Sequence, residues 1–160
     1  MHDLPVIKRA EDLRVDKPWG YEIRWAVTDR YLGKILHVNK GEALSLQYHQ
    51  RKDECQLVIK GSADIELGGP EGALVKHRVR AGDTLHLKPG TRHRITAVED
   101  TDIFEVSTAE GDDVVRLEDR YGRAGQGGAS GAGSARPGVL RGDVPPQKER
   151  RPNRKLPESR

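Results

Sequence analysis

The chain has 160 residues and lacks three things: paired cysteines, long apolar segments and extended helical periodicity. Its single cysteine, Cys55, excludes an internal disulfide and fits a reducing compartment such as the cytoplasm. No apolar run is long enough to span a bilayer, and residues 1–5 lack the apolar core of a signal peptide. We therefore expect a cytoplasmic protein without a membrane partner.

A net positive charge is also lacking in most of the chain, although the formal net charge of the whole is +3. Residues 124–160 hold eight Lys or Arg against three acids, which leaves residues 1–123 with a net charge of −2. Specific nucleic-acid binding by the folded part is therefore not expected. The segment 124–134 is almost entirely Gly, Ala and Ser, and the remainder is rich in Pro, Arg and Lys. Such a composition buries too little apolar surface to offset its ordering entropy, so we predict a single folded domain at 1–123 and a disordered tail at 124–160.

Short apolar runs separated by turn signals occupy the predicted domain. Residues 21–27 alternate, which predicts a strand whose buried face carries Tyr21, Ile23, Trp25 and Val27. About nine short strands follow one another at the spacing of a β-sandwich or barrel. Since no helix separates them, the fold class is all-β and antiparallel. We expect a short helical turn only within residues 112–123.

Four polar side chains predict a metal site. Gln47 and His49 are two residues apart, so a strand places both on one face. Glu54 follows the polar break at 50–53, and a hairpin can fold it back beside them. His93 comes from a later turn-rich stretch. One amide, two imidazoles and one carboxylate form a mixed N/O set suited to a divalent metal with open positions.

We expect one divalent ion per chain, Mn or Zn before Fe or Ni, bound by His49, Glu54 and His93. Gln47 is a weaker fourth ligand, and its alternative role is a hydrogen bond to one of the ligands. The alternative for the whole set is a polar barrel mouth without metal.

The neighbours of these residues receive simpler interpretations. Cys55 follows Glu54 and should face the opposite way, as a small buried residue rather than a nucleophile. Lys52 and Lys88 could serve a phosphate, but solvation is the usual state of a charged loop residue. Trp19 and Trp25 are expected in the core or at an interface, not as sugar platforms.

Two stretches resemble the motifs of the cupin superfamily. The spacing of Gly41, Gln47, His49, Glu54 and Gly61 is similar to the first cupin motif. The stretch from residue 82 through Gly90 to His93 is similar to the second. The resemblance implies a double-stranded β-helix, or jelly roll.

A closer resemblance covers roughly residues 15–123 and is to the C-terminal cupin domain of type II phosphomannose isomerases. It implies a metal-dependent isomerase that interconverts mannose 6-phosphate and fructose 6-phosphate, or a close analogue, with a sugar phosphate as substrate. Gln at the first ligand position is typical of that family. The pieces that carry the resemblance are KPWGYE at 17–22, LSLQYH at 44–49, GTRHR at 90–94 and VRLEDRYGR at 115–123.

Residues 50–56 depart from the family pattern. Histidine is replaced at 50 and 51, Lys52 stands where Arg is usual, and Cys55-Gln56 replace His-Trp. The metal ligands remain, but the pocket wall changes. Two alternatives therefore stay open: another metal-dependent cupin enzyme (an epimerase, lyase or dioxygenase), or a non-catalytic sugar- or metabolite-binding module.

Two arginines are candidates for holding a phosphate or orienting a sugar. The resemblance implies Arg123, which ends the YGR motif, as the first candidate catalytic residue. Arg94 is the second because it adjoins His93, although strand alternation can turn it outward. The alternative for both is an ion pair at the surface. We also expect a homodimer, with residues 4–7 as an exchanged arm.

Overall fold

The structure is a computed structural model that describes residues 7–125. These residues form eleven strands and one short 3-10 helix, which confirms the predicted all-β class with two strands more than expected. The predicted arm and tail lie almost wholly outside the described residues. The elements are η1 (Ala10–Leu13), β1 (Arg14–Lys17), β2 (Gly20–Val27), β3 (Tyr31–Val38), β4 (Leu46–His49), β5 (Glu54–Lys60), β6 (Ser62–Gly68), β7 (Val75–Arg80), β8 (Thr84–Leu87), β9 (Arg92–Ala97), β10 (Thr101–Thr108) and β11 (Val114–Glu118).

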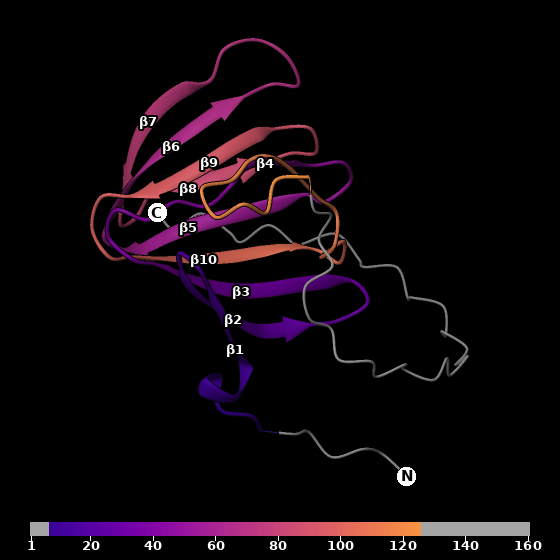
Figure 1. The fold of residues 1–160 in the computed structure, drawn as a ribbon. Helices are drawn as coiled ribbons and strands as arrows, with labels where there is room; N and C mark the ends of the chain where they lie inside the picture. The colour runs from indigo at the N-terminus through magenta and orange to yellow at the C-terminus, as the bar shows by residue number, and fades with distance from the viewer. Residues whose placement is uncertain (1–6, 126–160) are drawn as a thin grey trace, which may run out of the picture. The chain divides into compact units, whose positions relative to one another are not determined.

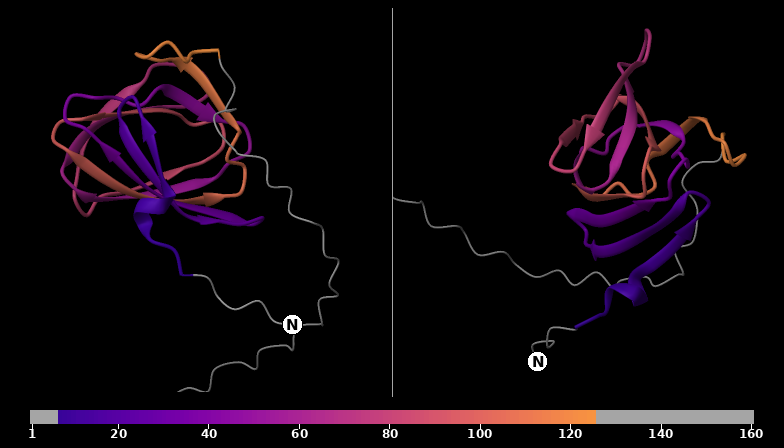
Figure 2. Two further views of the ribbon diagram at one scale, coloured as in Figure 1. Left: turned by 60° about the horizontal axis from the view of Figure 1, so that its bottom comes forward. Right: turned by 90° about the vertical axis from the view of Figure 1, so that its left-hand side faces the viewer.

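The strands form two antiparallel sheets that enclose a common interior (Figures 1 and 2). The six-stranded sheet has the order β1-β2-β3-β10-β5-β8, and the five-stranded sheet has the order β11-β4-β9-β6-β7. Each sheet therefore combines strands that are distant in the sequence. Residues from both halves of the chain meet inside, as the predicted jelly roll requires.

The interior changes from polar to apolar along the strands. On β5 the buried positions are Glu54, Gln56 and then Val58, and on β9 His93 is followed by Ile95 two residues later. Side chains that alternate along a strand share one face, so each inward row carries both kinds of residue. The apolar end is closed by a buried cluster centred on Val38, Val58, Ile65, Ile95 and Ile103. The polar end, with the buried side chains of Glu54, Gln56 and His93, is where a functional site can form.

The predicted facing of β2 is wrong. Glu22 is only 5% exposed, whereas Trp25 is 42% and Val27 is 66% exposed. The alternation is present, but the polar row faces the interior because the interior at this end is itself charged. On the outside, the Trp25 ring stacks on Phe104 with centroids 5.2 Å apart. Trp19, by contrast, belongs to the apolar core as expected.

The segment after β10 also differs from expectation. Residues 114–118 form β11 rather than the predicted helical turn, and β11 pairs with β4 so that Val114 lies opposite His49. Two β-branched residues, Val114 and Val115, begin this strand and favour the extended form. The free edge of β4 supplies the hydrogen-bonding partner that the sequence alone does not reveal.

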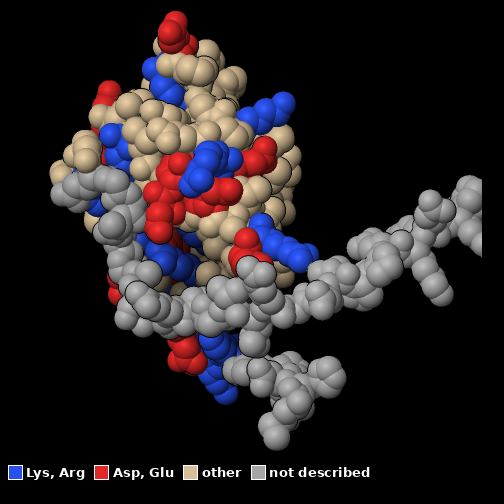
Figure 3. Space-filling model, turned by 90° about the vertical axis from the view of Figure 1, so that its right-hand side faces the viewer, with Lys and Arg blue, Asp and Glu red and all other residues tan. Residues whose placement is uncertain are grey.

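Within residues 7–125, no helix is long and apolar enough to cross a membrane. Acidic and basic side chains are interspersed on the face that Figure 3 shows. That pattern agrees with the small net charge of the predicted domain.

Candidate metal centre

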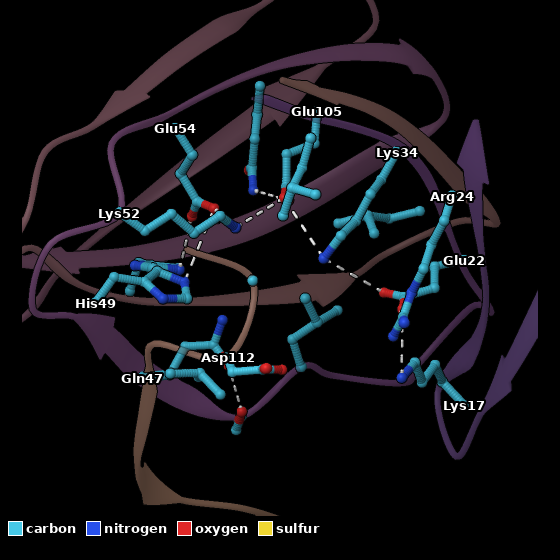
Figure 4. A pocket seen from close by; sticks show the side chains of 18 of the residues that line it. Lys17, Glu22, Arg24, Lys34, Gln47, His49, Lys52, Glu54, Glu105 and Asp112 are labelled. Carbon is cyan, nitrogen blue, oxygen red and sulfur yellow. Dashed lines mark hydrogen bonds and ion pairs between the residues drawn. The ribbon is translucent and has the colours of Figure 1, made fainter. Parts of the chain in front are cut away.

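Three of the four predicted ligands meet inside the barrel. His49 from β4, Glu54 from β5 and His93 from β9 are all buried, and one ligand atom from each lies within 4.8 Å of the others. His93 Nε2 is 3.4 Å from Glu54 Oε1, and His49 Nε2 is 3.8 Å from Glu54 Oε2. Figure 4 shows His49 and Glu54 pointing toward one another from their separate strands. We refer to His49, Glu54 and His93 as the inner group.

Backbone carbonyls fix the orientation of both imidazoles. His49 Nδ1 donates to the carbonyl oxygen of Asp113 at 3.2 Å, and His93 Nδ1 donates to that of Thr91 at 3.0 Å. Because a carbonyl can only accept, Nδ1 carries the proton and Nε2 presents a lone pair toward Glu54. His49 Nε2 is buried without a hydrogen-bond partner among the described residues. This unpartnered atom beside a carboxylate fits a metal ion, which would satisfy it.

Gln47 lies next to this group. It pairs in register with His93 across β4 and β9, and its Oε1 accepts a hydrogen bond from Ser45 Oγ at 2.7 Å. Gly90, with φ +82°, forms the turn before His93, and its N–H donates to His49 O at 2.7 Å. The positive φ favours glycine at this position. The hydrogen bond from Gly90 links the two segments that carry the histidines.

Lys52 is buried in the same interior, so its predicted solvation is wrong. It is 3% exposed, and its Nζ contacts Glu54 Oε2 and lies 2.9 Å from Glu105 Oε1. Gln56 Nε2 donates to the other oxygen of Glu105 at 3.2 Å. A buried ammonium needs such partners because isolated burial of a charge is very unfavourable.

Burial and these ion pairs shift the pKa values of the site. Burial, with Lys52 and His93 nearby, lowers the pKa of His49 to about 4. Burial and the Glu105 carboxylate raise the pKa of Glu54 to about 7. Burial alone would lower the pKa of Lys52, but Glu105 and Glu54 raise it above its ordinary value. At neutral pH the His49 ring is therefore neutral, with its proton on Nδ1, and Lys52 is a cation.

The inner group opens into a cavity of about 300 Å³. Gln47 and Lys52 line it beside the ligands, and its wall continues to strands β2 and β3, where Glu22 and Lys34 face inward (Figure 4). The arrangement can hold an ion and, next to it, a small polar molecule.

The two predicted arginines lie in different places. Arg94 binds Glu66 through two hydrogen bonds of 2.6 and 3.1 Å, and it is not part of the cavity wall. Arg123 does line the cavity, but its guanidinium donates two hydrogen bonds to Asp119 at 3.0 and 2.7 Å. Both arginines therefore form ion pairs, and their roles in catalysis stay predictions.

A second set of metal-ligand side chains lies on the other face of β5. Cys55 faces away from Glu54 as predicted, but it is exposed, so its predicted burial is wrong. One ligand atom each from Cys55, Asp53 and His86 lies within 4.8 Å of the others. His86 Nε2 is 2.9 Å from Asp53 Oδ1. We refer to Asp53, Cys55 and His86 as the outer group.

Sequence analysis missed two residues that hold the inner group in place. Glu105 shares a strand face with the buried, apolar Ile103 on β10, so strand parity places its carboxylate inside. Asp113 accepts hydrogen bonds from the backbone N–H groups of Arg51 and Lys52 at 2.6 and 2.9 Å. No local signal identifies Asp113, because its partners are about sixty residues away.

Comparisons with known proteins agree with this architecture. Mannose-1-phosphate guanylyltransferase ManC of Salmonella typhimurium is 33% identical over 114 residues, which cover 68% of this chain and 23% of that protein. Xanthan biosynthesis protein XanB of Xanthomonas campestris pv. campestris is 29% identical over 115 residues, which cover 69% of this chain and 24% of that protein. The chain thus spans about a quarter of the length of these relatives.

Solved structures establish the fold. KdgF from Halomonas sp. aligns with a TM-score of 0.54 at 23% identity, covering 62% of this chain and 90% of that one. Oxalate decarboxylase from Bacillus subtilis aligns with a TM-score of 0.58 at 19% identity, covering 72% of this chain and 34% of that one. The predicted cupin jelly roll is confirmed. Residues 8–119, more than half of the chain, match the family described as mannose-6-phosphate isomerase C-terminal, and the chain belongs to that family.

Proposed function

We propose that this chain is a metal-dependent sugar-phosphate isomerase that interconverts mannose 6-phosphate and fructose 6-phosphate or a close analogue. The family membership of residues 8–119 supports the substrate class. The observation that carries the proposal is the inner group, in which two oriented imidazoles and a carboxylate converge at the wall of a cavity. A mixed N/O set of this kind suits a divalent ion with open positions, Mn or Zn before Fe or Ni.

Aldose–ketose isomerisation moves a proton between two adjacent carbons beside a carbonyl. His49, Glu54 and His93, with Gln47 beside them, would hold a divalent ion, which would supply Lewis-acid polarisation of the carbonyl oxygen. The protein orients the ligands through their backbone hydrogen bonds and excludes bulk water from the buried end of the cavity.

Lys52 has a defined place in this proposal. Its Nζ holds its proton at neutral pH because Glu105 and Glu54 raise its pKa. It is therefore suited to donate a hydrogen bond or a proton, not to take a proton from carbon. This leaves the base among the remaining groups of the cavity and its bound water.

The test uses the full chain loaded with Mn or Zn and incubated with mannose 6-phosphate in D₂O. NMR should show fructose 6-phosphate with deuterium at C1, and deuterium at C2 of the mannose 6-phosphate that re-forms. His93→Ala should abolish both, because it removes a ligand, whereas His86→Ala, in the exposed outer group, should leave both unchanged.

A metal-loaded wild type that gives neither product nor exchange across a panel of hexose phosphates contradicts the proposal. Oxygen uptake with iron would then favour a dioxygenase, and a ligand recovered unchanged would favour a binding module.

The homodimer stays a prediction. The outer face of the six-stranded sheet exposes Trp25, Val27 and Val106, and contact with a second copy would remove this apolar area from water. Sedimentation of the full chain at micromolar concentration tests it, and a monomer there contradicts it.

A further inference from the structure

Three basic side chains surround one buried carboxylate at the β2–β3 side of the cavity. Glu22 Oε1 lies 2.6 Å from the Arg24 guanidinium and 3.4 Å from Lys17 Nζ, and Glu22 Oε2 lies 3.9 Å from Lys34 Nζ. All four residues line the same cavity as the inner group. Figure 4 shows Lys17, Arg24 and Lys34 converging on Glu22 from their separate strands. We call Lys17, Arg24 and Lys34 the basic cluster.

The basic cluster carries more positive charge than its carboxylate neutralises. Lys34 also approaches Glu105 Oε1 at 3.9 Å, but that oxygen already accepts a hydrogen bond from Lys52 at 2.9 Å. Six basic and four acidic side chains line the cavity, and Asp119, which binds Arg123, raises the number of acids to five. A divalent ion at the inner group adds further positive charge. An anionic ligand would therefore balance the cavity.

Lys34 is poorly satisfied where it lies. Its side chain is 16% exposed, and both of its ion pairs measure 3.9 Å, longer than a hydrogen bond. An ammonium has three donors, so those of Lys34 remain available to an oxyanion. The surroundings of Lys17 also disfavour its positive charge. Burial lowers the pKa of Lys17, and Arg24 and Lys34 lower it further, although Glu22 opposes them. A bound anion would favour the charged form.

We propose that the basic cluster binds the phosphate group of the substrate while the sugar extends toward the inner group. A phosphomonoester is a dianion with three acceptor oxygens, which suits the two ammonium groups together with the part of the Arg24 guanidinium that does not contact Glu22. The guanidinium of Arg123, the first choice from the sequence, is likewise bound to a carboxylate, that of Asp119, and the basic cluster is preferred because two lysines accompany its arginine. The assignment deepens the proposed function and rests on it for the identity of the sugar.

The test measures binding rather than turnover. The metal-loaded full chain is titrated by calorimetry with inorganic phosphate, with sorbitol 6-phosphate, which has no carbonyl to isomerise, and with sorbitol. Lys34→Gln should weaken the binding of both phosphate-bearing ligands by about tenfold or more, the loss expected for a charge-assisted contact. Sorbitol affinity and metal content should not change. The exposed β7 residue Lys76, replaced by Gln, is the matched control.

Lys17→Gln provides an independent variant in case Lys34→Gln fails to fold, which circular dichroism would reveal. Phosphate affinities equal to wild type in both folded variants, or no phosphate binding by wild type, overturn the assignment. If phosphate binding depends on the cluster but no hexose phosphate is isomerised, the assignment stands and the proposed function fails. If isomerisation occurs with an unchanged KM in both variants, the function stands and the assignment fails.

Discussion

Two groups of metal-ligand side chains lie on opposite faces of strand β5, which contributes Glu54 to one and Cys55 to the other, and the groups differ in how they are held. In each group one ligand atom per residue lies within 4.8 Å of the others, and each group contains histidine and a carboxylate. In the inner group both imidazoles are anchored at Nδ1, and His49 Nε2 is left without a partner. In the outer group His86 Nε2 is already bonded to Asp53 Oδ1 at 2.9 Å.

The difference shows why a set of ligand types does not by itself define a site. An ion entering the inner group satisfies His49 Nε2, which is otherwise buried and unpaired, although it must share the Glu54 carboxylate with Lys52 Nζ. An ion entering the outer group must break a hydrogen bond and strip water from side chains that are nearly half exposed. We therefore expect strong binding inside and weak binding outside, although the ligand atoms of both groups lie within 4.8 Å of one another.

The largest expected effect is the loss of a ligand from the inner group. His93→Ala should weaken binding of Mn or Zn by more than about 100-fold, since changes in residues that merely orient ligands already cost 10–100-fold. His86→Ala should leave the affinity unchanged. Competition with a chromogenic chelator measures both variants in parallel. Equal affinities for the two variants would contradict the distinction between the groups.

Acid should weaken the inner group in a defined pH range. In the metal-free protein the pKa of Glu54 is raised to about 7, so below that pH the carboxyl holds a proton that an ion must displace. His49, with its pKa lowered to about 4, adds no such competition above pH 5. The metal affinity should therefore fall by about tenfold per pH unit below 7 and level off above it.

Calorimetry at pH 6 in buffers of different ionisation enthalpy tests this directly. It should show nearly one proton released per ion bound, and nearly none at pH 8.5. Glu54→Gln should remove the proton release together with much of the affinity. Release of two protons at pH 6 would instead mean that the imidazoles titrate near their ordinary pKa.

A smaller effect is expected from Asp113, which binds the loop before Glu54 through the N–H groups of Arg51 and Lys52. Asp113→Ala should reduce metal affinity by about tenfold, because the loop and the carbonyl that orients His49 lose their fixed position. Asp100→Ala is a matched control, since Asp100 similarly accepts the Lys40 N–H at 2.8 Å. Equal effects of the two variants would indicate a general loss of stability.

The proximity of Gln47, His49 and Glu54 was predictable because their spacing is local, whereas His93 joins them from a later stretch of the chain. Gln47 and His49 share a strand face, and Glu54 follows within one hairpin, so short-range geometry places them together. Strand alternation also places Arg94 outside, where it pairs with Glu66. The all-β fold class was predictable from the short apolar runs and the frequent turn signals between them.

The facing of β2 and the burial of Lys52 were not predictable in this way. A period of two divides a strand into two faces but does not say which one is inside. Apolar residues normally mark the inner face. Here Glu22 is buried among the charged residues of the interior, and Trp25 lies outside. Lys52 is buried because Glu105, 53 residues later, supplies its partner. Such long-range pairing of charges has no signature in the local sequence.

The smallest expected effect concerns Cys55. Cys55→Ser should change the inner group's metal affinity by less than about twofold and the free energy of unfolding by less than about 0.5 kcal/mol, as is usual for exposed positions.

Cobalt provides a specific readout, because the inner group contains no sulfur. The first equivalent of Co²⁺ should bind without a thiolate-to-cobalt charge-transfer band. The band should appear only at much higher concentration, in wild type and in His93→Ala, and never in Cys55→Ser. A band at the first equivalent would reverse the expected order of affinity between the two faces of β5.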